Sequence, residues 1–174
     1  MDLSRQTEVG RINNRLALHQ QHLELPPHST AKQSPIKMAA RDPITCHVLN
    51  TLTGTPAANL PVTLTQMISS TSKPATFQAT TNADGRVANW TPVGGSASVP
   101  SILSALPAAD SKTNWAVRFE TGPWYEAQGI ESFWPEVEVK FTVKGRGREG
   151  EEGWRHYHVP VLLGPWNYST YRGS

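Results

Sequence analysis

The sequence predicts an all-β sandwich of two sheets, with about eight short strands and one short helix. Apolar and polar residues alternate in short runs between residues 44 and 172, and a period of two is typical of half-buried strands. Gly, Pro, Asn and Asp separate these runs, as they do at turns. The chain has 174 residues, 37% of them hydrophobic, which suffices for one domain with its own core but not for two.

The first 42 residues are expected to form a flexible leader, and residues 43–174 a single domain. The leader is polar and rich in Gln and His, so it lacks the apolar side chains that a packed unit needs. Within it, Arg15-Leu16 and His22-Leu23 stand seven positions apart and would share one face of a helix. This pattern resembles an N-terminal peroxisomal targeting signal, with a chance match in a disordered tail as the alternative.

Composition excludes several classes of partner. The net charge is only +2, from 16 basic and 14 acidic residues, and the basic residues are scattered, so nucleic acid is not an expected partner. No apolar run is long enough to span a bilayer, so no membrane association is expected. Cys46 is the only cysteine, which rules out an intrachain disulfide and favours a reducing compartment. If the leader does not target the peroxisome, we expect a cytoplasmic protein.

The first half of the domain predicts four strands. In the first of them Thr45, His47 and Leu49 share one face, because alternate residues of a strand point the same way. Cys46, Val48 and Asn50 share the other face. Asn82-Ala83-Asp84-Gly85 predicts a tight hairpin turn that places Arg86 at the start of the fourth strand. The four strands are expected at residues 44–52, 60–66, 76–81 and 86–90.

The second half predicts four more strands and one helical turn. Residues 91–112 are rich in Ser, Pro and Ala without periodicity, so we expect an inserted surface loop there. Residues 144–153 are charged and Gly-rich, which indicates a solvated connector. The last two strands flank Gly164-Pro165-Trp166 and are expected to pair as a hairpin. The strands are expected at residues 115–120, 137–143, 156–163 and 167–172, and the helical turn at 124–129.

Polar and titratable side chains concentrate on one face of the last two strands. In residues 156–163, His156, His158, Pro160 and Leu162 share a face, and four apolar or aromatic residues occupy the other. The second of these faces is suited to the core. Histidine, tyrosine, arginine and serine near the chain end cannot be buried cheaply, so we expect the surface that carries them to be a functional site.

Three segments, HVLNTLTGTPA at residues 47–57, TNADGR at 81–86 and YHVPVLLGPWNYSTYRGS at 157–174, resemble the signatures of the 5-hydroxyisourate hydrolase family of transthyretin-like proteins. The resemblance covers roughly residues 43–174. It implies a transthyretin-like sandwich that assembles as a homotetramer, with its cleft at a dimer–dimer interface. It also implies a hydrolase that needs no cofactor and opens 5-hydroxyisourate to 2-oxo-4-hydroxy-4-carboxy-5-ureidoimidazoline in urate breakdown, a process that is commonly peroxisomal in eukaryotes.

Carried onto this sequence, the resemblance implies that His47, Arg86, His158 and Ser174 are catalytic, and that His47, Arg86 and Tyr171 bind the substrate. An imidazole can take a proton from water and return it to a leaving nitrogen. A guanidinium can donate two hydrogen bonds to a urate-like edge. The spacing does not say which histidine is the base. Either histidine alone could instead be a packed, hydrogen-bonded residue of a strand, and Arg86 a surface residue of a hairpin.

Two other functions stay open from the residues. His47, His156 and His158 could together ligate a catalytic zinc ion, since three imidazoles suffice for such a site, although no carboxylate or thiol accompanies them and the resemblance implies no metal. A transthyretin-like carrier could hold a small hydrophobic ligand in the same channel without turning it over. The carrier reading is disfavoured by the His, Arg, His and terminal YRGS set, which animal transthyretins lack.

Overall fold

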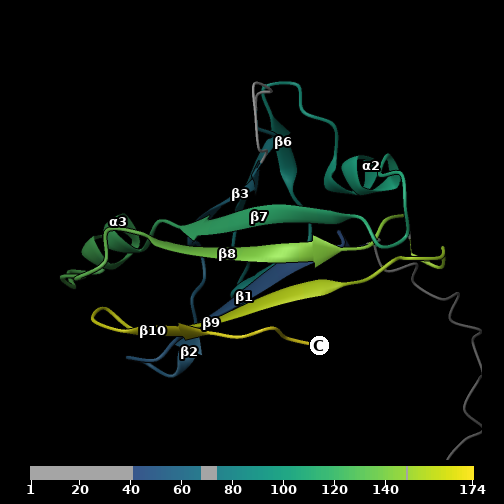
Figure 1. Cartoon of the computed structure of the whole chain (residues 1–174). Helices are drawn as coiled ribbons and strands as arrows, with labels where there is room; N and C mark the ends of the chain where they lie inside the picture. The colour runs from purple at the N-terminus through teal and green to yellow at the C-terminus, as the bar shows by residue number, and fades with distance from the viewer. Residues whose placement is uncertain (1–40, 68–73, 148) are drawn as a thin grey trace, which may run out of the picture. The chain divides into compact units, whose positions relative to one another are not determined.

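The computed structural model describes residues 41–67, 74–147 and 149–174. Residues 1–40 of the predicted leader, with its targeting pattern, therefore lie outside the described residues. Ten strands form two sheets in this part of the chain, and two short helices accompany them. Figure 1 shows the sheet of β1, β9 and β10 beneath that of β3, β7 and β8. The two-sheet, all-β prediction is confirmed.

Each sheet has five strands. The first runs in the order β10-β9-β1-β2, with β5 also paired to β1, and the second in the order β6-β4-β3-β7-β8. The strands of the first sheet are β1 (Ile44–Asn50), β2 (Thr55–Pro56), β5 (Arg86–Val87), β9 (Tyr157–Leu163) and β10 (Tyr168–Thr170). Those of the second are β3 (Pro61–Met67), β4 (Thr76–Thr80), β6 (Thr91–Val93), β7 (Lys112–Phe119) and β8 (Val137–Lys144).

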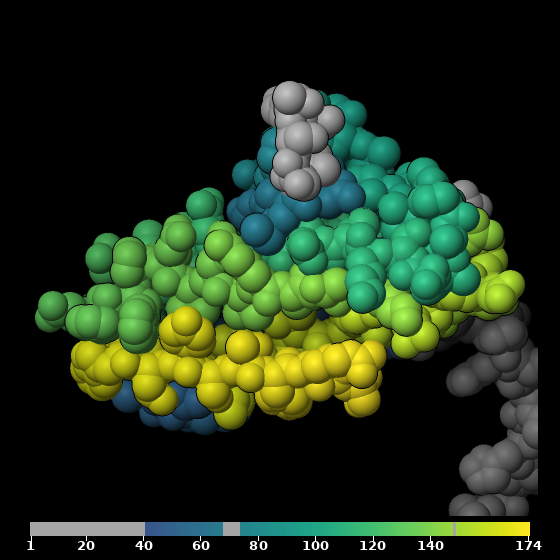
Figure 2. Space-filling view, in the orientation of Figure 1, coloured from purple at the N-terminus to yellow at the C-terminus, as the bar shows by residue number. Residues whose placement is uncertain are grey.

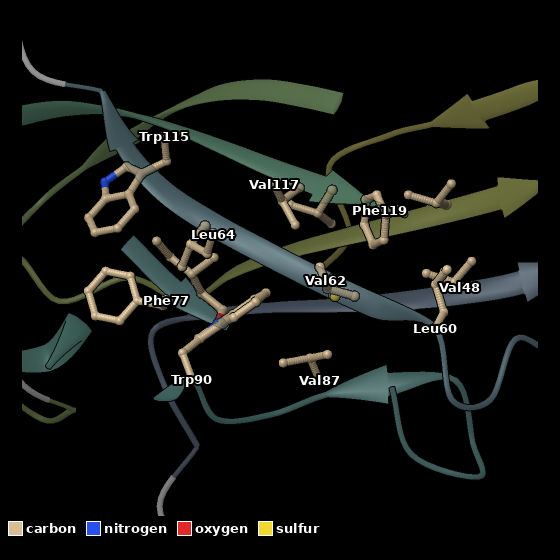
Figure 3. Packing of buried hydrophobic residues seen from close by; sticks show 14 of the residues in the cluster. Val48, Leu60, Val62, Leu64, Phe77, Val87, Trp90, Trp115, Val117 and Phe119 are labelled. Atoms are coloured by element: carbon tan, nitrogen blue, oxygen red, sulfur yellow. The ribbon is translucent and has the colours of Figure 1, made fainter. Parts of the chain in front are cut away.

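The predicted core face of residues 156–163 is correct, and β1 shows the same alternation of faces. Ile44, Cys46 and Val48 of β1 are at most 1% exposed, so the opposite face, with Thr45 and His47, looks away from the core. On β9 the apolar set from Tyr157 to Leu163 is buried in the same way. Figure 3 shows side chains of both sheets gathered in one cluster. Burying this apolar surface is the main stabilising contribution to the fold.

The pairing of β1 with β9 positions the site, and alternation alone did not predict it. The two strands run parallel, with Thr45 beside His158 and His47 beside Pro160. The partner of a strand depends on the whole sandwich, because sequence periodicity defines faces but not neighbours. This register places outward residues of β1 next to outward residues of β9, and so joins the signature segments at residues 47–57 and 157–174.

The predicted tight turn at residues 82–85 forms, with the Gly85 N–H donating to the Asn82 carbonyl at 2.9 Å, and Arg86 begins the next strand, but the flanking strands do not pair as the predicted hairpin. β4 pairs with β3 and β6 in one sheet, while β5 pairs with β1 in the other, so this turn carries the chain between sheets. The Asn82 side-chain oxygen accepts hydrogen bonds from the backbone N–H groups of Asp84, at 3.0 Å, and Arg86, at 2.9 Å. Gly85 has φ +70°, and a Cβ atom at this position would overlap the Val48 carbonyl oxygen, so no side chain fits there.

The segment 91–112, expected to be an irregular loop, contains regular structure. Its start is β6, which pairs with β4, and α2 (Val99–Ser104) follows, capped by the Ser98 hydroxyl. Val99 and Leu103 are buried in the core. The second helix, α3 (Thr121–Glu126), begins three residues before the predicted helical turn. The described residues thus contain two short helices where one was expected.

The 144–153 segment, expected to be a solvated connector, is fastened to this insertion. The Gly145 N–H donates to the Ser111 carbonyl at 2.9 Å. One guanidinium nitrogen of Arg146 donates to the Pro107 carbonyl at 3.0 Å. Gly147 is buried and its N–H points to the Leu103 carbonyl, at 3.4 Å. Hydrogen bonds to the 91–112 segment therefore hold residues 145–147 in place, ahead of β9.

Candidate functional site

His47 and Arg86 lie opposite each other on neighbouring strands. They are partners in the antiparallel register of β1 and β5, so their side chains leave the same face of the sheet. The His47 ring is half-buried, and the backbone of Asp84, in the turn that leads to Arg86, lies near enough to affect its pKa. The inter-sheet turn thus lies beside both the histidine and the arginine.

His158 joins this pair from β9. Its ring centroid lies 6.4 Å from that of His47, with 28° between the ring planes. The positive charge of Arg86 acts on both imidazoles. The structure therefore brings His47, Arg86 and His158 together, from segments that are far apart in the sequence, on the outward face of the first sheet.

The Thr45 hydroxyl connects two histidines of this face. Thr45 Oγ1 lies 2.8 Å from His158 Nδ1 and 3.0 Å from His156 Nε2. The ring of Trp154 stacks on His156, with centroids 6.4 Å apart. Sequence reasoning noted that Thr45 and His47 share a face, but it gave Thr45 no role and considered His156 only as a possible zinc ligand. Only the parallel register, which pairs Thr45 with His158, could have drawn attention to them.

The end of the chain packs beside His158. The Gly173 N–H donates to the His158 carbonyl at 2.9 Å, so the tail continues the sheet edge for one more bridge. A Cβ on Gly173 would lie 2.6 Å from His158 Cδ2, closer than carbon atoms approach. Ser174 follows directly and is exposed. Ser174, which the resemblance implies to be catalytic, is therefore held near His158 through the backbone of Gly173.

A groove of about 230 Å³ runs between β8 and the tail. Figure 2 shows the yellow C-terminal segment beside the green segment that includes β8. Tyr171 is 61% exposed and lines this groove together with His158 and Arg172. The Arg172 guanidinium lies over the Tyr157 ring, 5.5 Å from its centroid. Tyr171 thus shares a groove with His158, whereas His47 and Arg86 are not among the residues that line it.

Burial and positive neighbours keep the site histidines neutral. Burial lowers the pKa of His47, and the charge of Arg86 lowers it further, while the Asp84 backbone and carboxylate oppose both. For His158, burial again comes first and Arg86 second as causes of a lowered pKa. An imidazole whose pKa falls below the ordinary value of about 6.5 is a proton acceptor at neutral pH. Both rings can therefore act as bases.

The geometry lends no support to a zinc site at these histidines. Within the ranges that the structure describes, no three His, Cys, Asp or Glu side chains come together as metal ligands. His158 Nδ1 and His156 Nε2 both face the Thr45 hydroxyl, which is not the shared vacant point that a metal ion would need. Cys46 is buried, where burial raises the pKa of its thiol to about 12.

No helix in the described part is long and apolar enough to cross a bilayer.

Two curated proteins resemble this chain over most of its length. A "Probable 5-hydroxyisourate hydrolase" of Schizosaccharomyces pombe is 37% identical over 134 residues, which span 75% of this chain and 90% of that relative. The 5-hydroxyisourate hydrolase of Mus musculus is 33% identical over 133 residues, spanning 76% of this chain and 95% of the mouse protein.

Solved structures share the fold. The 5-hydroxyisourate hydrolase of Klebsiella pneumoniae aligns with a TM-score of 0.50 and 30% identity, over 75% of this chain and 97% of that one. Sea bream transthyretin in complex with thyroxine aligns with a TM-score of 0.55, over 75% of this chain and 94% of that one, at only 23% identity. It therefore shows the fold alone. Residues 44–173 match the family described as the HIUase/Transthyretin family, and the chain belongs to that family.

Proposed function

We propose that this protein is a 5-hydroxyisourate hydrolase, which opens the six-membered ring of its substrate to 2-oxo-4-hydroxy-4-carboxy-5-ureidoimidazoline. The observation that carries this proposal is the meeting of His47, His158 and Arg86 on one open face. Its second support is that relatives of more than 30% identity are named as this hydrolase. The reaction is hydrolysis of a cyclic amide in urate degradation, and it requires only water as co-reactant.

The site histidines carry out the proton transfers in the proposed mechanism. One neutral imidazole takes a proton from a water molecule as its oxygen attacks the C6 carbonyl carbon. The tetrahedral intermediate then collapses, and the ring nitrogen leaves with a proton donated by an imidazolium. Positioned acids and bases of this kind contribute typically 10²- to 10⁴-fold in rate. His47 and His158 lie close enough, at 6.4 Å between centroids, for one substrate to contact both.

Arg86 supplies positive charge where the reaction develops negative charge. Its guanidinium can donate paired hydrogen bonds to the carbonyl and imide edge of the substrate. Preorganised donors of this sort are most effective on the oxygen of the attacked carbonyl. Tyr171 and Ser174 are proposed to fix the ring and the tail of the site. The carrier alternative gains no support, because an apolar ligand would give the outward histidines and arginine no partner.

The decisive experiment follows the ultraviolet decay of 5-hydroxyisourate generated from urate, with and without the purified protein. We expect a large acceleration over the spontaneous rate, and a loss of at least about 100-fold in His158→Ala and in Arg86→Gln. Arg118→Gln is the matched control, because Arg118 lies on β7 of the other sheet, where its ion pairs with Glu120 and Glu136 are exposed. No acceleration by the folded wild-type protein would end the proposal.

Residues 43–174 are proposed to form a hydrolase domain that assembles as a homotetramer through the site face. Support comes from apolar side chains on that face: Leu162 is 39% exposed and Leu49 is half-buried. Pro160, which shares the face with Leu162, is already buried within the chain. Light scattering should give about four times the 19.1 kDa chain mass. A monomer that retains full activity would contradict this assembly.

The leader, residues 1–42, is proposed to carry a peroxisomal targeting signal formed by Arg15, Leu16, His22 and Leu23. Its support is the sequence pattern together with the proposed role in urate breakdown. A fluorescent protein fused after residue 42 should accumulate in peroxisomes, and the same fusion with Arg15→Ala should remain diffuse. A diffuse signal from the unaltered leader would contradict the assignment and leave a cytoplasmic location.

A further inference from the structure

The hydrogen bonds at Thr45 constrain each other, because a hydroxyl has one proton to donate. Thr45 Oγ1 is within hydrogen-bond distance of His158 Nδ1, at 2.8 Å, and of His156 Nε2, at 3.0 Å. A neutral imidazole carries its proton on one of two nitrogens. If Thr45 donates to one ring, it can accept only from the other. The protonated nitrogens of His156 and His158 are therefore coupled through this oxygen.

Two arrangements satisfy both contacts when the Thr45 proton is itself used in one of them. In the first, His158 Nδ1–H donates to Thr45, and the Thr45 O–H donates to a bare His156 Nε2, so the lone pair of His158 lies on Nε2. In the second, His156 Nε2–H donates to Thr45, and the Thr45 O–H donates to a bare His158 Nδ1. His158 then carries its proton on Nε2. Because Nδ1 is engaged by Thr45, proton exchange with water falls to Nε2. Only the first arrangement therefore makes His158 a base.

We propose that Thr45 is a positioning residue that holds His158 in the tautomer with its proton on Nδ1, and that His156 enforces this by accepting the Thr45 hydroxyl proton. The inference rests on the proposed function, since it assigns His158 the role of base. It adds two residues to the site that act through His158 without touching the substrate.

The same chain of contacts can carry a proton. When His158 Nε2 takes a proton from water, the ring becomes an imidazolium that still donates through Nδ1–H. Moving the Nδ1 proton to Thr45 Oγ1, while the Thr45 proton passes to His156 Nε2, leaves a neutral His158 and a protonated His156. No atom or electron is left over in this exchange. The reverse movement restores the imidazolium of His158, which can then protonate the leaving nitrogen.

The surroundings of His156 suit it to the outer end of this chain. It is half-buried, and Trp154 stacks on one side of it with 18° between ring planes. Arg41 and Glu149 act on it with opposite charges. Around His158 the charged and titratable neighbours are Arg86, His47, His156 and Arg41, and no carboxylate of the described residues acts on it. His156 is therefore the one of the two rings with a carboxylate nearby, although burial and Arg41 outweigh Glu149 and lower its pKa.

Four variants test the proposal in the full-length protein. Thr45→Val keeps the branched shape that suits a strand and removes the hydroxyl, so we expect kcat to fall roughly 10- to 100-fold with KM within about twofold. Thr45→Ser should restore kcat to within about threefold of wild type. His156→Leu leaves Thr45 free to donate to His158 and should lose as much as Thr45→Val, whereas His156→Gln keeps an acceptor oxygen and should retain most activity. Thr65→Val, on β3, is the matched control.

Imidazole nitrogen NMR gives a readout that a purely structural role would not move. In wild type we expect His158 to show Nδ1–H and His156 to show a bare Nε2 at about pH 7.5, above the ordinary histidine pKa of about 6.5. Thr45→Val and His156→Leu should shift His158 toward the Nε2–H form, and the double variant should lose no more than either single one. Wild-type kcat and an unchanged pH profile in folded Thr45→Val, or a wild-type His158 protonated on Nε2, would overturn the inference. Failure of the wild-type protein to hydrolyse 5-hydroxyisourate would instead refute the proposed function, and the NMR result would remain a separate measurement.

Discussion

Gly173 leaves no room for a side chain beside the His158 ring. A Cβ atom at this position would lie 2.6 Å from His158 Cδ2 and 3.0 Å from Pro160 Cγ. Gly173→Ala should therefore push the imidazole aside while the backbone bridge to His158 remains. Displacements of about 1 Å can cost roughly 100-fold in rate, so we expect at least a tenfold loss of kcat/KM in the hydrolase assay.

The neighbouring strand β10 offers the control for that change. Ser169 is exposed there, so Ser169→Ala should leave both the rate and the melting temperature close to those of the wild type. Wild-type activity in Gly173→Ala would show that hydrolysis does not depend on the position of the His158 ring seen in the structure.

The lowered pKa values of the site histidines set the direction of the pH dependence of stability. For His47, His156 and His158, burial is the first cause of a pKa below the ordinary value. The unfolded chain keeps a value of about 6.5, so below that pH it binds protons that the folded state does not. The stabilisation is complete above pH about 6.5 and is lost as the pH falls through the folded pKa values.

Thermal unfolding between about pH 8 and pH 5 measures this loss. The melting temperature should fall on the acid side, and it should fall less in His158→Gln, which removes one of the titrating rings. An equal melting temperature across this range would contradict the burial of the histidines. Activity should fall over the same interval, since protonated imidazoles cannot act as bases.

At the residue scale, the sequence predicted which side chains point outward but not which of them touch. Alternation put Thr45 and His47 on one face and His158 on the outward face of another strand, because a one-residue slip would bury polar groups. The Thr45 hydroxyl contacts with His156 and His158 depend on strand register over 111 and 113 residues of separation. A local sequence pattern does not predict contacts between residues that are so far apart in the chain.

The helix α2 closes part of the core although it lies in the segment expected to be irregular. Leu103 is 3% exposed within the main cluster, and its neighbour Ile102 is only partly buried. Leu103→Ala should lower the free energy of unfolding by about 2–5 kcal/mol through lost burial and the cavity left behind. Ile102→Ala should cost less. Denaturant titration of both variants measures the difference, and equal costs would contradict the assigned packing.

Sequence reasoning missed α2 because the helix is only six residues long, too short for a period to emerge. The usable signal was the start: Ser98 accepts a hydrogen bond from the Ser101 N–H as the cap, and a proline follows within the first turn. The turn at residues 82–85 was misread for another reason. The Asn and Gly that suit a hairpin also suit a tight crossing between sheets, and only the pairing of β5 with β1 distinguishes the two.

For the whole molecule, the position of the tail predicts an asymmetry between the two chain ends. Gly173 bridges to His158 and Ser174 follows it, so residues added after Ser174 must begin within the site. A hexahistidine tag there should lower kcat/KM at least about tenfold while the melting temperature stays unchanged. The same tag at Met1 should have no effect on the hydrolase assay. Equal rates for both tagged proteins would place the tail outside the working site.

The parallel pairing of β1 with β9 has a consequence for synthesis in the cell. Thr45 is synthesised 113 positions before His158. At ribosomal speeds the delay between the two residues is roughly 5 to 25 seconds. During that interval the emerging chain exposes the edge of β1 without its neighbour, which invites wrong partners. A product of interrupted translation that lacks β9 also lacks His158 and the neighbour of β1, so we expect it to be inactive.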